Sequence, residues 1–331
     1  MKTIKASIIG FGSVGQGVAK VLLRKNEELR SMGLDIKVVA VADSKTSVVD
    51  MNGLDLAHVL ERKASEGIVG DANTTGHEII RDVDHDLVIE TTPTNINTGG
   101  VGLQNMIMAF NKKRHVVTSN KGPLALKYNE LSALASKCGC AFRFEATAGG
   151  AMPLLNLVRD TLAGNEVISI EGIFNGTCNY ILTRMMEEHA TYELMLAEAQ
   201  ELGIAEKDPT YDVEGIDSAC KLVILANAIF GMDVAYEDVH VTGISRITPE
   251  ALMLAETNGY VVKLIGEVNR QRIQVAPRLV PIGHPLAVGG TLNVASLQTD
   301  LAGPVTVVGR GAGSIETASA ILSDIISIYR N

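Results

Sequence analysis

The stretch Gly10-Phe11-Gly12-Ser13-Val14-Gly15 decides the fold, because it follows an apolar run and precedes a helical pattern. Strand, glycine turn and helix in this order are typical of the first βα unit of a dinucleotide-binding domain. The three glycines allow a sharp turn and a close approach to a pyrophosphate, and the helix N-terminus offers N–H donors. We expect these six residues to contact NAD or NADP. The alternative is a simple tight βα turn.

Further strands and helices alternate after this unit. Apolar runs at residues 37–42, 86–90, 115–119 and 141–145 predict strands, and helical patterns at 101–113 and 128–138 separate the later ones. The alternation predicts an α/β fold with a Rossmann-type doubly wound parallel sheet.

Polar residues follow three of these strands, where an open parallel sheet forms its ligand crevice. Asp43 after the second strand would accept the ribose hydroxyls of NAD, and Lys45 would meet the 2′-phosphate of NADP. The sequence does not choose between the cofactors. Thr91 and Thr92 are candidates to line the cofactor, or their hydroxyls cap a loop. Lys121 could reach the junction of nicotinamide and substrate, or lie in a solvated loop.

The alternation stops near residue 145, and the next segment predicts a second domain. Helices at 154–163, 179–188, 192–202 and 213–230 and paired strands at 260–269 and 272–281 indicate an inserted α+β domain for substrate binding and dimerisation. Asp212 is a good N-cap for the helix at 213–230. A strand at 304–309, a glycine turn containing Gly311 and a helix at 314–329 suggest that the chain then returns to the nucleotide domain, and we expect Gly311 to contact the cofactor. We therefore expect domains at 1–145 plus 304–331 and at 146–303.

The polar stretch at residues 199–221 lies within the inserted domain. Asp217 and Lys221 are four residues apart on a helix whose neighbouring positions are apolar, so both side chains project from one largely buried face. Buried charges need partners or a chemical role. A structural ion pair is the alternative. Asn175 and Thr177, between a strand and a helix, suit the polar groups of a small substrate.

Composition narrows the class of partner. The 331 residues carry 29 basic and 38 acidic side chains, a net charge of −9, which argues against nucleic acid or an anionic membrane. Four cysteines are too few for a disulfide framework. No signal peptide and no membrane span is evident, so we expect a cytoplasmic protein that acts on a small molecule.

Several segments together resemble the homoserine dehydrogenase family. Residues 199–221 contain A-x3-G, a D-P step and D-x-x-G-x-D-x3-K. G-F-G-S-V-G, T-S-N-K-G-P-L, E-A-T-A-G-G-A-M-P, N-G-T-C-N-Y-I-L and a closing G-R-G-A-G are similar to the same family in the same order. The resemblance implies interconversion of L-homoserine and L-aspartate 4-semialdehyde with NAD or NADP, on the route to threonine and methionine.

The resemblance also implies residue roles. Lys221 would be the acid/base and Lys121 its helper, while Asp217 would hold the substrate or a water and Glu206 the substrate ammonium. A structural sodium site would be formed by Glu145 with the carbonyls of Ala148, Gly150 and Met152. A homodimer or higher homo-oligomer is expected. Arg310 stands where the family pattern has proline, and with the chain ending at Asn331 we expect no appended regulatory domain and no threonine feedback through one.

Two other functions remain open on the residues alone. A phosphorylating aldehyde dehydrogenase would use Cys178 as its nucleophile, but no histidine lies in the segments expected to form the crevice. A non-catalytic NAD(P) sensor would bind the cofactor without turnover.

Overall fold

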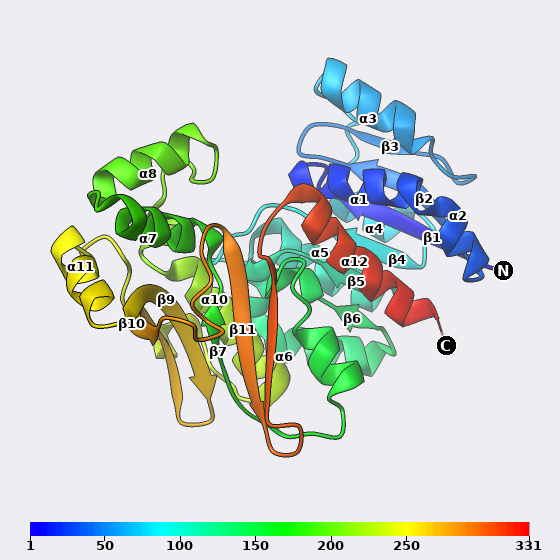
Figure 1. Cartoon of the computed structure of the whole chain (residues 1–331). Helices are drawn as coiled ribbons and strands as arrows, with labels where there is room; N and C mark the ends of the chain where they lie inside the picture. The colour runs from blue at the N-terminus through cyan, green and yellow to red at the C-terminus, as the bar shows by residue number, and fades with distance from the viewer. Residues whose placement is uncertain (331) are drawn as a thin grey trace. The chain divides into compact units, whose positions relative to one another are not determined.

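The computed structural model describes residues 1–330 and divides the chain into two units. The first unit comprises residues 1–150 and the segment from Gly313, and the second comprises Ala151–Ala312 (Figure 1). The first unit is therefore discontinuous in sequence, as expected. Within residues 1–330, no helix has the length and the apolar character that crossing a membrane requires.

The first unit is built on a six-stranded sheet in the order β3-β2-β1-β4-β5-β6. All neighbours pair in parallel except β3, which is antiparallel to β2 at the edge. Strand order reverses between β1 and β4, the switch point at which such sheets bind ligands. The strands are β1 (Lys2–Ile9), β2 (Leu34–Ala42), β3 (Ser47–Val49), β4 (Leu87–Glu90), β5 (His115–Thr118) and β6 (Phe142–Arg143).

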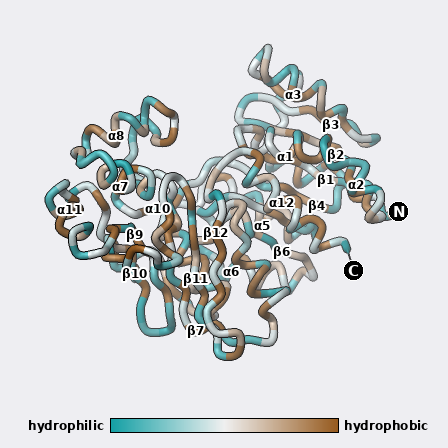
Figure 2. Tube along the Cα trace, viewed as in Figure 1, coloured by the Kyte–Doolittle hydropathy of each residue, from teal (hydrophilic) through white to brown (hydrophobic). Residues whose placement is uncertain are grey.

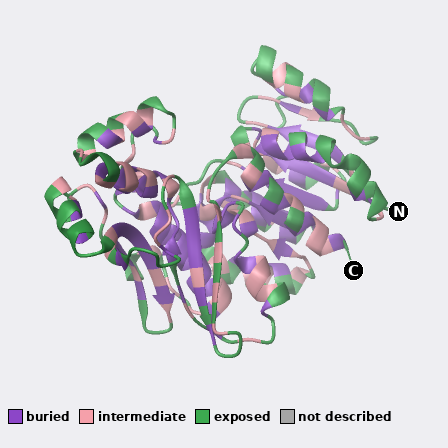
Figure 3. Cartoon of the chain, in the orientation of Figure 1, coloured by how far each residue is buried: buried purple, intermediate pink, exposed green. Residues whose placement is uncertain are grey.

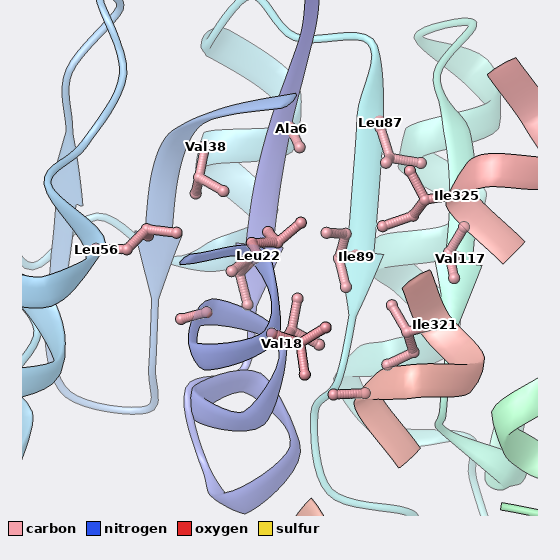
Figure 4. Close-up of a cluster of buried hydrophobic side chains, with 14 of the residues drawn as sticks. Ala6, Val18, Leu22, Val38, Leu56, Leu87, Ile89, Val117, Ile321 and Ile325 are labelled. Carbon is pink, nitrogen blue, oxygen red and sulfur yellow. The ribbon is translucent and has the colours of Figure 1, made fainter. Parts of the chain in front are cut away.

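Helices cover both faces of this sheet. Val18 and Leu22 of α1 and Ile321 and Ile325 of α12 pack with Ile89 and other strand residues in one apolar cluster (Figure 4). Neighbouring strand residues face the other way, where Ile9 lies against α4. The helices are α1 (Ser13–Arg24), α2 (Asn26–Ser31), α3 (Leu56–Ser65), α4 (Gly76–Asp82), α5 (Gly100–Asn111), α6 (Lys121–Cys138) and α12 (Ser314–Tyr329), with a 3-10 turn η1 (Glu145–Thr147).

The second unit contains another six-stranded sheet, in the order β12-β11-β7-β9-β10-β8. Its neighbours are antiparallel except the short β8, which pairs in parallel with β10. The strands are β7 (Val167–Ile173), β8 (His240–Val241), β9 (Tyr260–Asn269), β10 (Arg272–Pro281), β11 (Leu292–Thr299) and β12 (Pro304–Arg310).

The placement of β12 corrects one prediction. We expected the chain to return to the nucleotide domain at residue 304, but β12 pairs antiparallel with β11 along its whole length. It therefore belongs to the second sheet, and the chain re-enters the first unit only at Gly313, before α12. The expected boundary at 145/146 also shifts, to 150/151.

The helices of the second unit include one that is almost wholly buried, α10 (Ile216–Phe230). Figure 3 shows this burial, whereas α8 and α11 present much exposed surface. Figure 2 shows apolar residues concentrated on the strands of both units. The remaining helices are α7 (Gly176–Glu188), α8 (Tyr192–Glu201), α9 (Thr210–Val213) and α11 (Pro249–Thr257), with a π-helical segment η2 (Leu157–Thr161) and a 3-10 turn η3 (Tyr236–Asp238).

Candidate active site

The glycine turn after β1 has the geometry of a phosphate-binding turn. Gly10 has a φ of 96°, and a Cβ there would lie 2.6 Å from the carbonyl of Thr91. A Cβ on Gly15 would lie 2.1 Å from the carbonyl oxygen of Gly10. Only glycine fits these two positions, which confirms the sharp turn and the close packing of helix on strand.

Gly12 differs from its neighbours because a Cβ there would meet nothing within 4 Å. Gly12 is also the N-cap of α1, and no side chain caps that helix. The first N–H groups of α1 are thus left for a ligand beside open space, which fits the pyrophosphate of NAD or NADP. Phe11 is different, because its side chain is buried in the apolar cluster, so that only its backbone is free to contact a ligand. Ser13 is exposed and Val14 half-buried.

Thr91 and Thr92 follow β4 beside this turn. The Thr91 hydroxyl donates to the carbonyl oxygen of Gly10 at 2.6 Å, and the Thr92 hydroxyl donates to the Glu90 carboxyl. Both hydroxyl groups therefore donate their hydrogen bonds to other groups of the protein. Thr91 shapes the glycine turn, so any contact that it makes with a cofactor uses its remaining atoms.

Asp43 lies after β2 with its carboxylate almost enclosed. It accepts hydrogen bonds from the backbone N–H groups of Lys45 and Thr46 at 2.7 Å and from Lys63 Nζ at 2.6 Å. Burial raises the pKa of Asp43, but these hydrogen bonds and the Lys63 charge outweigh it, and the pKa is held below its usual value. Asp43 is thus ionised and paired with Lys63, a residue that sequence analysis did not single out.

Lys121 is the first residue of α6, whose N-cap is Asn120. The sequence predicted a helix only from residue 128, with Lys121 in a loop after the strand. The structure instead joins two helical segments across a kink at Lys127, so Lys121 stands at a helix start. Its backbone position is therefore fixed by helical hydrogen bonding.

Lys221 and Asp217 form a buried pair on α10, as their spacing predicted. Lys221 Nζ lies 2.7 Å from Asp217 Oδ2 and donates to the carbonyl oxygen of Phe174 at 2.6 Å. Only 7% of Lys221 and 5% of Asp217 is exposed. A charged pair with so little solvent is costly to bury, so the pair on α10 is a candidate for a chemical role more than a source of stability.

Asn175 extends this pair into a polar cluster. Its Nδ2 donates to Asp217 Oδ2 at 3.0 Å and to Asp212 Oδ1 at 2.7 Å, while its Oδ1 caps α7 at the N–H of Cys178. Burial and the nearby Asp217 charge raise the pKa of Asp212. We call Asn175, Asp212, Asp217 and Lys221 the lysine cluster.

Sequence analysis missed Asp212 as a site residue. It interpreted Asp212 as the N-cap of a helix at 213–230, whereas α10 begins at Ile216 behind Gly215, whose φ of 79° suits glycine. The signal that could have found it was its place as the first acidic residue of the D-x-x-G-x-D-x3-K pattern.

Three other candidates lie in the second unit. Thr177 lies at the start of α7 and donates to the carbonyl oxygen of Ile204 at 3.2 Å. Glu206 is exposed, and its backbone carbonyl accepts from Gln200. The Cys178 thiol donates to the carbonyl oxygen of Asp212 at 3.1 Å, and burial raises its pKa well above the ordinary value. Such a thiol is a poor nucleophile.

The expected sodium ligands and Gly311 lie apart from this cluster in sequence. Glu145, Ala148 and Gly150 belong to the first unit, and Met152 to the second; all four are buried. Over residues 1–330, no three His, Cys, Asp or Glu side chains are grouped to hold a metal ion. A Cβ on Gly311 would lie 1.9 Å from Asn293 Nδ2, so packing in the second unit alone requires this glycine.

Comparison with known proteins identifies the family of the chain. The model of the homoserine dehydrogenase NAD-binding domain matches residues 10–145, and the homoserine dehydrogenase model matches residues 153–326. A homoserine dehydrogenase of Methanocaldococcus jannaschii is 54% identical over 98% of both chains.

Solved structures agree in fold along almost the whole chain. A putative homoserine dehydrogenase of Archaeoglobus fulgidus superposes with a TM-score of 0.94 at 51% identity, covering 99% of this chain and 100% of that one. A hyperthermophilic archaeal homoserine dehydrogenase in complex with NADPH gives 0.87 at 29% identity, covering 98% and 97%. The chain belongs to the homoserine dehydrogenase family, whose members are NAD(P)-dependent oxidoreductases that act on a CH–OH group.

Proposed function

We propose that this chain interconverts L-homoserine and L-aspartate 4-semialdehyde, and that Lys221 exchanges the proton with the substrate oxygen. The observation that carries the assignment is the buried Lys221 ammonium, hydrogen-bonded to Asp217 and to the Phe174 carbonyl. In a biosynthetic setting the reaction would supply homoserine for threonine and methionine. A cytoplasmic location is expected, because the reaction uses a soluble cofactor and a small polar amino acid.

The proton step follows from the chemistry of an alcohol and an aldehyde. When bound, the nicotinamide ring exchanges a hydride with the carbon that bears the oxygen. Reduction of the aldehyde needs an acid within hydrogen-bond reach of that oxygen, and an ammonium group supplies the proton. Asp217 stabilises the charged lysine between turnovers, and the Phe174 carbonyl directs one N–H bond. Lys121, at the start of α6, is proposed to assist by contacting the substrate.

Recognition of the amino-acid part is assigned to the residues around the start of α7. Asn175 and Thr177 would contact the polar groups of the substrate, because a helix N-terminus favours a carboxylate. Glu206 would bind the ammonium group, since its exposed carboxylate is not enclosed by the protein. Asp217, shared between Asn175 and Lys221, would link recognition to the proton step.

The cofactor is assigned to the first unit, on Gly10, Gly12, Gly15 and the N–H groups that open α1. Asp43 would accept a ribose hydroxyl of NAD. Lys63, 2.6 Å from Asp43, would offset the repulsion between that carboxylate and the 2′-phosphate of NADP. We infer that both cofactors are used. Lys63→Ala should then raise the KM for NADP more than the KM for NAD, and an equal change for both would contradict this role.

A structural sodium ion and a homo-oligomer complete the proposal. Glu145 is a buried carboxylate followed by a turn rich in small residues, and a carboxylate together with backbone carbonyl oxygens suits a hard cation. Thermal melts in sodium and in potassium test that site. Large apolar side chains are exposed in the second unit, at Ile168, Leu279, Ile282, Leu301 and Val308. Such residues mark an association surface, and light scattering of the purified chain measures its mass.

The central experiment measures kcat/KM for homoserine with NAD and with NADP, in the wild type and in Cys178→Ser. Full activity of the variant is expected, because the buried thiol has a raised pKa and no activating histidine. Phosphate-dependent oxidation of an aldehyde that is lost in Cys178→Ser would favour the phosphorylating aldehyde dehydrogenase. Cofactor binding without turnover of homoserine would favour a sensor.

A further inference from the structure

The Glu90 carboxyl is a buried acidic group that the proposed reaction does not use. Glu90 is the last residue of β4, between β1 and β5, and is fully enclosed. Burial raises the pKa of the Glu90 carboxyl to about 7, against the opposing effect of hydrogen bonds from Thr92, Thr118 and Asn120. All of these donors are neutral, so they do not explain why an acid and not a neutral side chain stands at this position.

The carboxyl is the centre of a connected set of hydrogen bonds. Its Oε1 accepts from the Thr92 N–H at 3.1 Å and from the Thr92 hydroxyl, and its Oε2 lies 3.3 Å from the Thr118 hydroxyl. Asn120 Nδ2 donates to Thr92 Oγ1 at 3.1 Å, and the Asn120 N–H donates to Thr118 Oγ1 at 3.0 Å. Glu90 is therefore connected to Asn120 by hydrogen bonds through Thr92 and through Thr118.

Asn120 connects these hydrogen bonds to helix α6. It is the N-cap of that helix, and its Oδ1 accepts from the Gly122 N–H at 3.2 Å. The residue between them is Lys121. The position of the Lys121 backbone is thus tied, through Asn120 and Thr92, to a carboxyl at the end of β4.

Close packing leaves this set little room to rearrange. A Cβ on Gly102 of α5 would lie 2.4 Å from Asn120 Nδ2 and 3.2 Å from both Glu90 Oε2 and Thr92 Oγ1. Helix α5 therefore closes directly over the three side chains. Deletion of the carboxyl would leave the Thr92 N–H and hydroxyl without this acceptor, whereas the Thr118 hydroxyl keeps the Glu90 backbone carbonyl oxygen, 3.0 Å away.

We propose that Glu90 is a positioning residue, whose carboxyl fixes the start of α6 and so places Lys121 for the reaction. The inference rests on the proposed role of Lys121 at the substrate. Small displacements of a reacting group are costly, since a shift of about 1 Å can lower the rate roughly 10²-fold. Glu90 itself touches neither substrate nor cofactor in this role.

Glu90→Ala and Glu90→Gln separate positioning from charge. In Glu90→Gln the new amide oxygen would still accept from Thr92, and the amide NH₂ would donate to Thr118 Oγ1, so the set survives. We expect Glu90→Gln to retain the kcat of the wild type and Glu90→Ala to lose about 10- to 100-fold in kcat. The Kd for NADP, measured by fluorescence titration, should stay unchanged in both. A Glu90→Gln enzyme as impaired as Glu90→Ala would overturn the proposal.

Ser7→Ala is the matched control for a loss of stability alone. Ser7 is also fully buried in the same sheet, where its hydroxyl lies 3.0 Å from His85 Nε2, and it belongs to no proposed site. Its variant should unfold at lower urea concentration with normal kcat. If Glu90→Ala behaves in the same way, Glu90 is merely structural and the proposal fails. Should Glu90→Ala not fold, Thr92→Val removes the hydroxyl between Glu90 and Asn120 and is expected to lower kcat; a normal kcat would overturn the proposal.

Lys121→Ala distinguishes this proposal from the one on which it rests. If Glu90 acts through Lys121, Glu90→Ala should add little to the loss of kcat already caused by Lys121→Ala. Independent losses that multiply would overturn the positioning role and leave the Lys121 role intact. A Lys121→Ala enzyme with normal kcat would instead refute the Lys121 role, and the positioning role with it.

Discussion

The candidate sites of the two units differ in the groups that form them: backbone groups in the first unit and polar side chains in the second. In the first unit the cofactor turn is formed by backbone groups. A Cβ at Gly10 or Gly15 would lie within 3 Å of other atoms, so both positions require glycine, and the space beside Gly12 is open. In the second unit the lysine cluster consists of three ionisable side chains, from α9 and α10, and the amide of the α7 N-cap, with Lys221 only 7% exposed. The first site is proposed to recognise a phosphate that recurs in many ligands, and the second to transfer a proton to or from one substrate.

This difference predicts how each site responds to mutation. A backbone site is sensitive to added volume, since any side chain at its glycines fills space that the turn or its ligand needs. A buried charged site is sensitive to removal, since each partner left behind is unsatisfied. The variants below test that contrast.

Removal of Lys221 should have the largest effect. Lys221→Met keeps the volume of the side chain but supplies no proton, so kcat should fall on the order of 10²-fold or more. The stability of the variant should be lower as well, because Asp217 keeps its burial and loses its cation. Initial rates with saturating homoserine and cofactor measure the first effect and urea unfolding the second. Near-normal kcat would remove Lys221 from the mechanism.

Added volume at Gly15 and Gly12 should separate stability from cofactor binding. Gly15→Ala places a methyl group 2.1 Å from the Gly10 carbonyl oxygen and should cost about 1–3 kcal/mol in the free energy of unfolding. Gly12→Ala meets no protein atom and should leave that free energy unchanged. Its methyl would occupy the approach of the pyrophosphate, so the Kd for NADP should rise roughly tenfold, about 1.4 kcal/mol.

These two glycine variants would contradict the assignment of the turn if their effects were exchanged. A Gly12→Ala protein that binds NADP as tightly as the wild type would show that the ligand does not approach this backbone. Urea unfolding and fluorescence titration of both variants under one buffer condition decide the matter.

Local patterns explain what the sequence predicted correctly. The Asp217–Lys221 pair follows from i,i+4 spacing on one helix, and the glycine turn follows from its place between a strand and a helix. Helix α12 and the strands β9 and β10 have the predicted bounds, because a periodic pattern ends at clear turn residues. None of these features depends on a distant part of the chain.

The features that the sequence did not predict depend on distant contacts. Phe174, which accepts from Lys221, lies 47 residues before it. The strand β12 has an ordinary apolar pattern, and only its pairing with β11 assigns it to the second sheet. Asp212 was interpreted as a helix cap, because the left-handed conformation at Gly215 that separates α9 from α10 leaves no periodic signal. Sheet membership and side-chain convergence are tertiary properties that a local pattern does not encode.

Replacement of Asp212 should have the smallest effect and a distinct pH dependence. Burial and the Asp217 charge raise the pKa of folded Asp212 above 3.8, so the folded state binds more protons than the unfolded state between the two pKa values. The contribution of Asp212 to stability therefore falls as pH rises through that window. Asp212→Asn keeps the oxygen that accepts from Asn175 and removes the charge.

Asp212→Asn should accordingly gain in free energy of unfolding relative to the wild type as pH rises from about 4 to 7, measured by urea unfolding at both values. Asp208→Asn is the control of opposite sign. The Asp208 carboxylate accepts a hydrogen bond from Thr210, which lowers its pKa, so that variant should lose stability relative to the wild type as pH rises within a lower window, from about 2 to 4. If the free energy of unfolding of both variants changed with pH in the same direction, burial would not control the pKa of Asp212. The lysine cluster would then differ from the backbone site of the first unit only in its position in the fold.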